Sequence, residues 1–312
     1  MRQPPIVSIS GVVLFPAAFQ QGNDGMHTRL DHRLAVVLLL AGCASSPRSP
    51  EIPAPASPVP TSPVPTTSGR ASWIFSFSPG PIAYRISRSA SIENRSDSAS
   101  RREVSTNITH ELITLQPIAD TLGFTAAIDT FSTTTEGITG ATQLGQLPSQ
   151  LTGSITSDSL IIPGDTLGGT CNPLVTALVT DVHNLLPRLP ESLTTNQTWR
   201  DSTSLIGCQG SIPTKSRVIR VYRVMGGSVY ENTPVLLLQR TDTIHAEGEG
   251  AQLQHRILLD ANGSGTATYY LDTSNGQVLH LTVNQDLELT ITASGKANRF
   301  RQIARQEFAL LR

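Results

Sequence analysis

Apolar and polar residues alternate along one long segment in the last third of the chain. Its apolar positions are Leu279, Leu281, Val283, Leu287, Leu289 and Ile291. Only Gln285 interrupts this apolar side. Because successive side chains of a strand point to opposite faces, the period of two predicts a half-buried strand. At about 3.3 Å per residue the strand is on the order of 45 Å long, and it must twist or curl to pack. The pattern therefore predicts a curved sheet or a barrel-like wall.

Two turns set the expected register of the neighbouring strands. A three-residue loop over residues 274–276 keeps one face apolar, whereas a two-residue loop at Asn275 and Gly276 would bury Asp272. We therefore predict the three-residue loop, with Gly276 in the left-handed conformation. Ser294 and Gly295 predict a second, tight hairpin. The expected partners are Leu271 with Leu279, Tyr269 with Leu281, Ala267 with Val283, Phe300 with Leu289, Phe308 with Leu281, and Arg301 with Glu288.

Shorter alternating segments precede this meander. They lie at residues 82–86, 104–112, 115–128, 217–224, 235–243 and 252–259, and they predict further antiparallel strands. Residues 132–158 are rich in serine, threonine and glycine, which indicates loop with short strands at most. We therefore predict a mainly β fold, a curved antiparallel sheet or half-barrel, in a single domain over residues 73–312.

One amphipathic helix is expected at about residues 172–186. Asn172 can cap its start, and Pro173 suits its first turn. Pro187 and Pro190 end the pattern. The apolar residues at helical spacing are Leu174, Leu178, Val182 and Leu185, and the residues expected to face away are Thr176, Thr180, His183 and Asn184. Such a helix either covers one end of the core or forms a lid over an apolar cavity.

Near the N-terminus, a basic stretch precedes a short apolar run that ends in Leu40, Ala41, Gly42 and Cys43. The run is shorter than the about 20 apolar residues that span a bilayer. The segment resembles the signal of bacterial lipoproteins, in which small residues precede a cysteine that receives a diacylglycerol. The resemblance implies a signal peptide over residues 1–42, with Met26 as the expected start of translation, and a lipid anchor at Cys43.

Residues 43–72 are rich in proline, serine and threonine, which predicts an extended tether between the anchor and the domain. Neither Ala44 nor Ser45 is the aspartate that marks retention at the inner membrane in such lipoproteins. The resemblance therefore favours the outer membrane of the cell envelope, with the domain facing the periplasm or the surface.

Lipidation of Cys43 would leave an even pair of cysteines, Cys171 and Cys208. An oxidising compartment would join them in a disulfide. The alternative is two unrelated buried thiols, because sequence does not show that they meet in space.

Composition and charge exclude some partners. The net charge is −1 with 15% charged residues, so the chain offers no strong field for nucleic acid. Aromatic residues make up only 5% of the chain, which disfavours a stacking surface for carbohydrate or single-stranded nucleic acid.

The sequence shows no catalytic or cofactor motif, and we expect neither a cofactor nor a metal. The nearest resemblance to a nucleophile elbow is Gly263-Ser264-Gly265, which a loop or bulge between strands explains. His183 and His280 have no paired nucleophile and are expected at the surface.

One group of residues has metal-ligand character. His245, Glu247 and Glu249 alternate, so on a strand they would share a face. A solvated polar face explains the same pattern, and Gly248 and Gly250 make a turn an equal alternative. They are therefore weak candidates for metal ligands.

A second resemblance covers roughly the second half of the chain. Its elements are Leu189-Pro190, Gln197-Thr198-Trp199, and Tyr269-Tyr270-Leu271-Asp272 with Gly276. They are similar to a loose group of uncharacterised bacterial lipoproteins, although Asn196 occupies a position where that group would have a glycine. The resemblance implies no catalytic residues.

We expect a non-enzymatic envelope lipoprotein that binds an apolar ligand or an envelope partner. The alternatives are an envelope hydrolase whose site is not recognisable from sequence, and a structural scaffold. A binding module predicts an apolar concavity lined by Val182, Tyr269, Leu279 and Leu281. A scaffold predicts that the same residues fill a closed core.

Overall fold

A computed structural model describes most of the chain beyond residue 71. The described residues are 72–75, 79–96, 102–118, 121–135, 138–141, 150–155, 160–162, 171, 173–209, 212–252 and 255–311. The predicted signal segment, Cys43, most of the tether and the helix cap Asn172 lie outside them.

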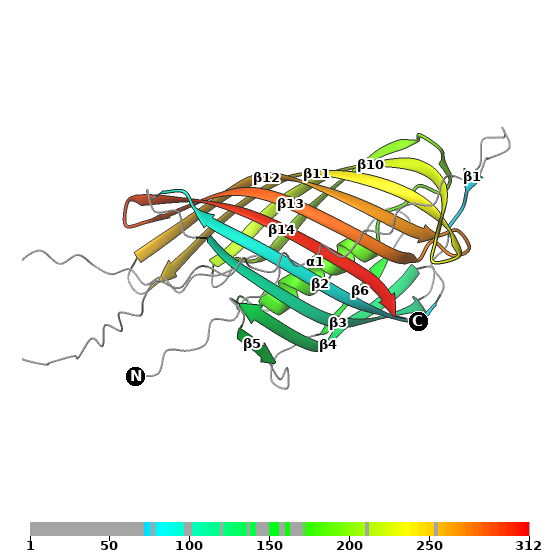
Figure 1. Cartoon of the computed structure of the whole chain (residues 1–312), viewed down its shortest axis with the longest axis horizontal. Helices are drawn as coiled ribbons and strands as arrows, with labels where there is room; N and C mark the ends of the chain where they lie inside the picture. The colour runs from blue at the N-terminus through cyan, green and yellow to red at the C-terminus, as the bar shows by residue number, and fades with distance from the viewer. Residues whose placement is uncertain are drawn as a thin grey trace, which may run out of the picture.

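Twelve strands of the described residues form one large antiparallel sheet (Figure 1). Its order is β7-β6-β4-β3-β2-β14-β13-β12-β11-β10-β9, and β5 pairs with β4. The strands are β2 (Gly80–Asn94), β3 (Arg102–Ile118), β4 (Thr121–Thr135), β5 (Ile138–Ala141), β6 (Gln150–Ile155), β7 (Leu160–Ile161), β9 (Thr198–Gln209), β10 (Ile212–Tyr230), β11 (Thr233–Gln252), β12 (His255–Asp272), β13 (Val278–Ala293) and β14 (Lys296–Leu311). A separate ribbon pairs β1 (Ser72–Trp73) with β8 (Leu193–Thr194).

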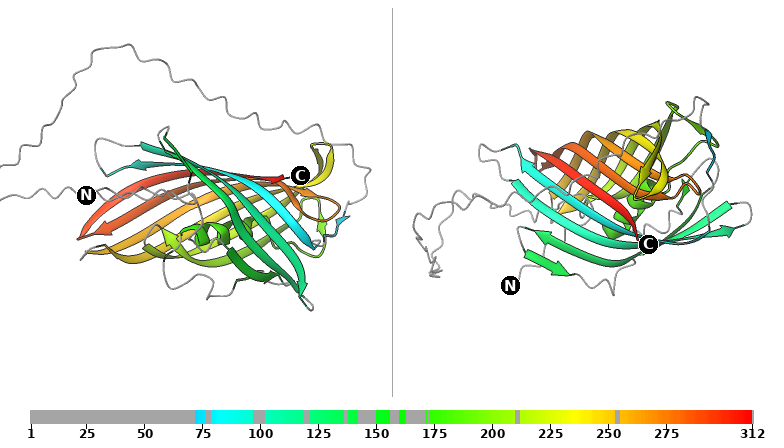
Figure 2. Two further views of the ribbon diagram at one scale, coloured as in Figure 1. Left: turned by 90° about the horizontal axis from the view of Figure 1, so that it is seen from below. Right: turned by 45° about the vertical axis from the view of Figure 1, so that its right-hand side comes forward.

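The sheet curls into a half-barrel, and the helix α1 (Pro173–Leu185) lies against its concave side (Figures 1 and 2). Long strands coil, so the sheet curves instead of staying flat. The prediction of a mainly β half-barrel with one amphipathic helix is thereby confirmed. Within the described part of the chain, no helix has the length and apolar character needed to cross a membrane.

The predicted turn is confirmed in the conformation of Gly276 but is wrong in its length, because Asp272 lies opposite Gln277 and the loop has four residues, 273–276, instead of three. Gly276 has a φ of +73°, and its amide donates to the Asp272 carbonyl oxygen over 2.8 Å. The observed partners are Tyr269 with Leu281, Ala267 with Val283, and Leu271 with Val278. The first two were predicted, whereas Leu279 was expected opposite Leu271. A β-bulge beside Tyr270 makes Leu279 the extra residue and shifts the pairing by one position.

The second hairpin has the predicted register throughout. Its pairs include Phe300 with Leu289, Phe308 with Leu281, and Arg301 with Glu288. Ser294 and Gly295 have φ values of +51° and +77°, as a tight primed turn requires. On the polar face the Arg301 guanidinium reaches the diagonal carboxylate of Asp286, with 2.6 Å between Nη2 and Oδ2.

The strands of the second half are longer than their sequence patterns predicted. The segment Gly263-Ser264-Gly265 lies inside β12 in continuous register with β11 and β13, so the expected loop or bulge is wrong. A Cβ atom at Gly265 would lie 3.2 Å from Oδ2 of Asp242, so the glycine leaves room for that buried carboxylate. Gly248 and Gly250 likewise lie within β11, not in a turn.

The main hydrophobic core fills the space between α1 and the sheet. Leu174, Leu178, Val182 and Leu185 of the helix are each at most 1% exposed. A second, smaller cluster on the concave face consists of Ile212, Ile257, Leu259, Ala261 and Leu289. The apolar face of the helix therefore packs as its sequence pattern predicts.

Asn196 departs from the glycine that the lipoprotein resemblance predicts at its position. Its φ is +67°, in the left-handed region that favours glycine and that asparagine tolerates. Its backbone amide donates to the Val224 carbonyl oxygen over 2.9 Å. Asparagine therefore preserves the backbone conformation of the turn before Trp199.

Candidate binding site

A row of polar residues crosses the concave face between the two hydrophobic clusters. Strand register aligns Arg220 with Asp242, Asp242 with Gly265, and Gly265 with Gln285. On the next two strands after β13, Gln306 of β14 pairs with Arg88 of β2. We define the polar belt as the inward-facing residues Arg88, Glu111, Asp181, Arg220, Arg240, Asp242, Gln285 and Gln306. Nearly all of these side chains are buried.

Arg88 connects the sheet to the helix. Its guanidinium donates to the Thr109 hydroxyl of β3 and to the Asp181 carboxylate of α1. It also lies 3.3 Å from Oε1 of Glu111. Because a buried charge is costly unless it is paired and hydrogen-bonded, these contacts fix the position of α1 on the sheet.

The pKa values of the two carboxyl groups beside Arg88 are both raised. Burial raises the pKa of Glu111 well above its ordinary value, and the Asp181 charge raises it further against the opposing effect of Arg88. Burial also raises the pKa of Asp181, while Arg88 and a hydrogen bond from Glu111 lower it. Both buried carboxyls therefore take up a proton more readily than ordinary ones, and Glu111 does so the more strongly.

Arg240 has partners on the helix and on the sheet, although its buried Nε makes no hydrogen bond among the described residues. Its Nε lies 2.8 Å from Oδ1 of Asp242, and its Nη2 donates to Oδ2 of the same carboxylate over 2.8 Å. Its Nη1 donates to Oδ1 of Asn184 over 3.0 Å and also to the Tyr269 hydroxyl. A charge-assisted hydrogen bond to a close carboxylate therefore neutralises this guanidinium.

Arg220 has fewer partners, although it is only 3% exposed. Its Nη1 donates to the Thr203 hydroxyl over 2.8 Å. The carboxylate of Asp201 is 3.9 Å away and lies 3.8 Å from Arg188 as well. Among the described residues, the buried Nε of Arg220 has no hydrogen-bond partner. In the described part of the chain, the charge of this guanidinium is thus matched only by a distant and shared carboxylate.

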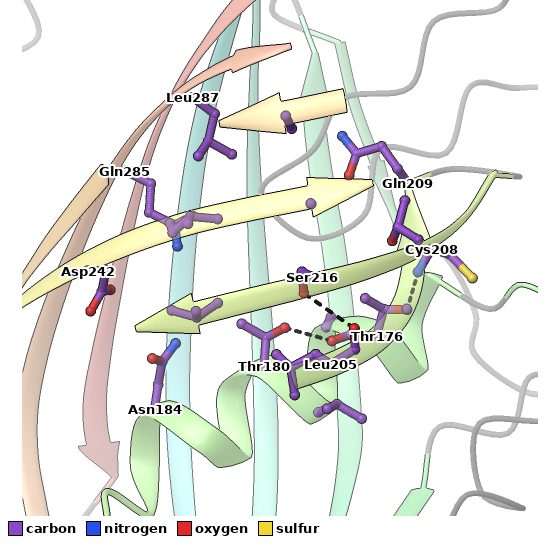
Figure 3. A pocket seen from close by; sticks show the side chains of 18 of the residues that line it. Thr176, Thr180, Asn184, Leu205, Cys208, Gln209, Ser216, Asp242, Gln285 and Leu287 are labelled. Carbon is purple, nitrogen blue, oxygen red and sulfur yellow. Dashed lines mark hydrogen bonds between the residues drawn. The ribbon is translucent and has the colours of Figure 1, made fainter. Parts of the chain in front are cut away.

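A cavity of about 160 Å³ opens between α1 and the concave face beside the polar belt (Figure 3). Arg220, Arg240 and Asp242 line it together with the helix residues Thr176 and Asn184. Figure 3 shows Thr176, Thr180 and Asn184 pointing from the helix towards the strands. The cavity is thus polar on its helix side and at the belt.

The opposite wall of the cavity is aliphatic. Its apolar residues come from β10 to β13 and are Val218, Ile244, Ala246, Leu259, Ala261, Leu287 and Leu289. Ala246 and Ala261 are direct cross-strand partners, and their small side chains leave space in this wall. A cavity with one charged end and one aliphatic wall suits a ligand that has a polar head and a hydrocarbon chain.

A disulfide joins Cys171 to Cys208, with 5.5 Å between their Cα atoms, as predicted. It connects the chain two residues before α1 to the edge strand β9. Cys208 also lines the cavity, and its amide donates to the Thr176 hydroxyl over 3.0 Å. The disulfide therefore holds the start of the helix against the sheet beside the cavity.

The polar side of α1 was expected to face solvent, and this expectation is wrong. Thr176, Thr180 and Asn184 line the cavity, and Asp181 contacts Arg88. His183 is also more buried than a surface histidine, and burial together with the Arg220 charge lowers its pKa to about 3. The helix turns both faces inward because the polar belt provides partners for its polar residues.

His280 was likewise expected at the surface, but it is buried. Its ring stacks on Tyr230 at a centroid distance of 5.3 Å and meets the edge of Tyr270 at 5.6 Å. Burial lowers the pKa of His280 against the opposing charge of Glu307. The imidazole acts here as a packing group on the outer side of the sheet.

The four residues proposed from sequence as ligand contacts lie elsewhere. Val182, Tyr269, Leu279 and Leu281 are all buried. None of them belongs to the described lining of the cavity. The structure therefore places them in the packed core and not at the cavity wall.

The weak metal candidates do share a face, as a strand requires. His245, Glu247 and Glu249 are exposed on β11. Glu249 pairs with Arg256, with 2.6 Å between Oε1 and Nε, and His245 hydrogen-bonds Asn262 over 2.8 Å. In the described part of the chain, no group of three histidine, cysteine, aspartate or glutamate side chains is placed to hold a metal ion.

Sequence reasoning missed the buried arginines of the belt. A signal for them was present, because Arg220 and Arg240 occupy inward positions in otherwise apolar alternation. Gln285, which interrupts the apolar side of β13, lines the cavity. Ser216 is the one serine in the described lining of the cavity, and its hydroxyl donates to the Leu205 carbonyl oxygen over 3.5 Å. That described lining contains no histidine.

Comparison with known proteins gives little beyond this geometry. No protein-family model matches the sequence. No curated protein matches it either. A protein from Bacteroides fragilis described as exported, with a YmcC-like fold, is similar at 9% identity and a TM-score of 0.23, covering 75% of this chain and 98% of its own. An outer membrane channel from Pseudomonas putida is similar at 4% identity and a TM-score of 0.22, covering 76% and 98%. Likeness at such TM-scores carries no conclusion about function.

Proposed function

We propose that the folded domain binds a single-chain amphipathic ligand in the cavity between α1 and the half-barrel. The observation that carries this proposal is the cavity itself, with an aliphatic wall on one side and buried charged groups at one end. A cavity of about 150 Å³ holds one benzene molecule, so the volume here suits a chain of about six to eight carbon atoms. The cavity is therefore smaller than most ligand pockets in proteins, and its ligand is expected to be small.

Octanol tests the proposal, because its eight-carbon chain matches the cavity. Each buried methylene contributes about 0.8 kcal/mol, and after the costs of association we expect a Kd on the order of 0.1–1 mM. Replacing Ala246 with phenylalanine fills the cavity at a half-buried wall position and should weaken octanol binding at least about tenfold. Isothermal titration calorimetry measures both affinities.

Ala297 provides the matched control, because it is exposed on β14 and does not line the cavity. Ala297→Phe should bind octanol as the natural protein does. Octanol binding that is equally strong in Ala246→Phe would contradict the cavity as the binding site.

We further propose that the domain is tethered to the cell envelope through a lipid on Cys43. The sequence Leu40-Ala41-Gly42-Cys43 and the following proline-rich stretch support this proposal. The tether would let the domain meet its ligand near a membrane without inserting into it.

Replacing Cys43 with alanine should abolish the lipid modification and leave the signal segment uncleaved. Mass spectrometry of the mature N-terminal peptide should show a diacylglycerol on Cys43 in the natural chain. Ser45→Ala, two residues away, should leave both properties unchanged. An unmodified Cys43 in the membrane-bound protein would overturn the proposal of a lipid anchor.

A further inference from the structure

The three arginines of the polar belt differ in how close the nearest carboxylate of the protein lies to each guanidinium. Arg88 meets the carboxyl groups of both Glu111 and Asp181, and Arg240 has a close partner in Asp242. Arg220 has no carboxylate closer than 3.9 Å, and that carboxylate, Asp201, is shared with a second arginine. One guanidinium therefore remains without a close counterion.

This guanidinium is buried and belongs to the lining of the cavity. Its Nε has no partner among the described residues, and the hydroxyl of Thr203 takes only one of its five N–H donors. An unpaired buried charge is costly, so an anion from outside the chain would gain strongly by pairing with it. Among the described residues, such an anion would compete with the carboxylate of Asp201, which is 3.9 Å away and shared with Arg188.

The charge of the site favours a monoanion. Carboxylates pair with Arg88 and Arg240 at short distance, whereas Asp201 lies 3.9 Å from Arg220 and is shared with Arg188. The site therefore offers a ligand one guanidinium charge that is only weakly paired. A carboxylate supplies one negative charge and a fork that matches a guanidinium, whereas a phosphate monoester carries about −1.5 to −2 and needs further donors.

The aliphatic wall continues from this charge along the same strands. On β10 the inward positions after Arg220 towards the strand start are Val218 and Ser216, and both line the cavity. Leu259 and Leu289 of the second cluster form the far part of the wall. A chain attached to a head group at Arg220 thus has an apolar surface to follow.

We propose that Arg220 binds the carboxylate of a single-chain fatty acid whose hydrocarbon tail lies against the aliphatic wall of the cavity. This inference rests on the proposed function and names the class of its ligand. Arg240 and Arg88 take no direct part, because carboxylates of the protein already pair with their guanidinium groups, although the buried Nε atoms of both arginines, like that of Arg220, lack a hydrogen-bond partner among the described residues.

Octanoate and octanol, which share one chain length and differ in the head, separate the two levels of the proposal. The natural protein should bind octanoate at least about tenfold more tightly than octanol at pH 7, since a charge-assisted hydrogen-bonded pair is about twice as strong as a neutral one. Arg220→Gln should bind the two compounds within about twofold of each other, because it lacks the charge on which the preference for octanoate depends. Calorimetric titrations measure all four affinities.

Arg217 is the matched control, because it lies three residues away on the same strand and is exposed on the other face. Arg217→Gln should keep the full preference for octanoate. Retained octanol binding in Arg220→Gln shows that the cavity is still formed. If that variant fails to fold, the preference of the natural protein for octanoate, and its reduction in Arg220→Lys, still decide the question.

The outcomes distinguish the inference from the function on which it rests. If octanol binds in the cavity and octanoate binds no more tightly, the fatty-acid inference fails and the apolar site stands. If Arg220→Gln keeps the tenfold preference, the carboxylate is bound elsewhere and the inference also fails. If neither compound binds the natural protein, both proposals fail.

Discussion

Replacing Arg88 with methionine should lower the free energy of unfolding at pH 7 by about 3–5 kcal/mol, the usual loss when one partner of a buried ion pair is removed. The variant leaves Glu111 and Asp181 facing each other without a cation in a buried site. It also breaks the contact that fixes α1 on the sheet. Urea unfolding followed by circular dichroism measures the loss.

The stability lost in Arg88→Met should become smaller on acidification, because protonation removes the charges of the two carboxyl groups. Glu111 has a raised pKa in the folded state, so the folded protein holds a proton that the unfolded chain releases above about pH 4.3. Without Arg88 the pKa values of both carboxyls rise further, and the variant loses more stability as the pH rises through this window. The stability of Arg88→Met should therefore approach that of the natural protein near pH 4.

Arg85→Met provides the control, since Arg85 is exposed on the same strand. Its effect should stay within about 0.5 kcal/mol, as is usual for surface substitutions. A loss for Arg88→Met that is equally small, or one that does not depend on pH, would contradict the account of the cluster.

Removing the disulfide should lower the free energy of unfolding by about 3–4 kcal/mol in the chain-entropy treatment. Cys171 and Cys208 are 37 residues apart in sequence, and this separation sets the size of the closed loop. The double variant Cys171→Ser and Cys208→Ser should show the loss in urea unfolding. It frees the start of α1 from β9, so amide hydrogen exchange in the first turn of the helix should accelerate as well.

The reduced natural protein is the companion measurement for the disulfide. Its unfolding free energy should match that of the double variant, because both lack the same covalent link. Two thiols that react with an alkylating agent in the unreduced, mature protein would show that the bond is absent and would contradict this prediction.

The register of the C-terminal meander could be predicted because local signals determine it. Period-two alternation assigns each residue to a face, and a turn such as Ser294-Gly295 then leaves one pairing that keeps the apolar face intact. The bulge at Leu279 could not be predicted, because the alternation continues through it without interruption.

The polar belt could not be predicted for a different reason. Its partners are distant in sequence: Arg88 and Asp181 are 93 residues apart, and Asn184 and Arg240 are 56 apart. Seen alone, a helix with one apolar and one polar face indicates a polar side in water. Only the curvature of the sheet brings charged strand positions to that side and turns it into the wall of a cavity.

The central claim is that an amphiphile lies in the cavity between α1 and the half-barrel, and its position can be measured directly. Nuclear Overhauser contacts between the terminal methyl group of bound octanol and methyl-labelled protein report which side chains surround the chain. We predict contacts to Leu259, Leu287 and Leu289. Contacts confined to exposed apolar residues outside the cavity, such as Ile303 and Leu311, would contradict the claim.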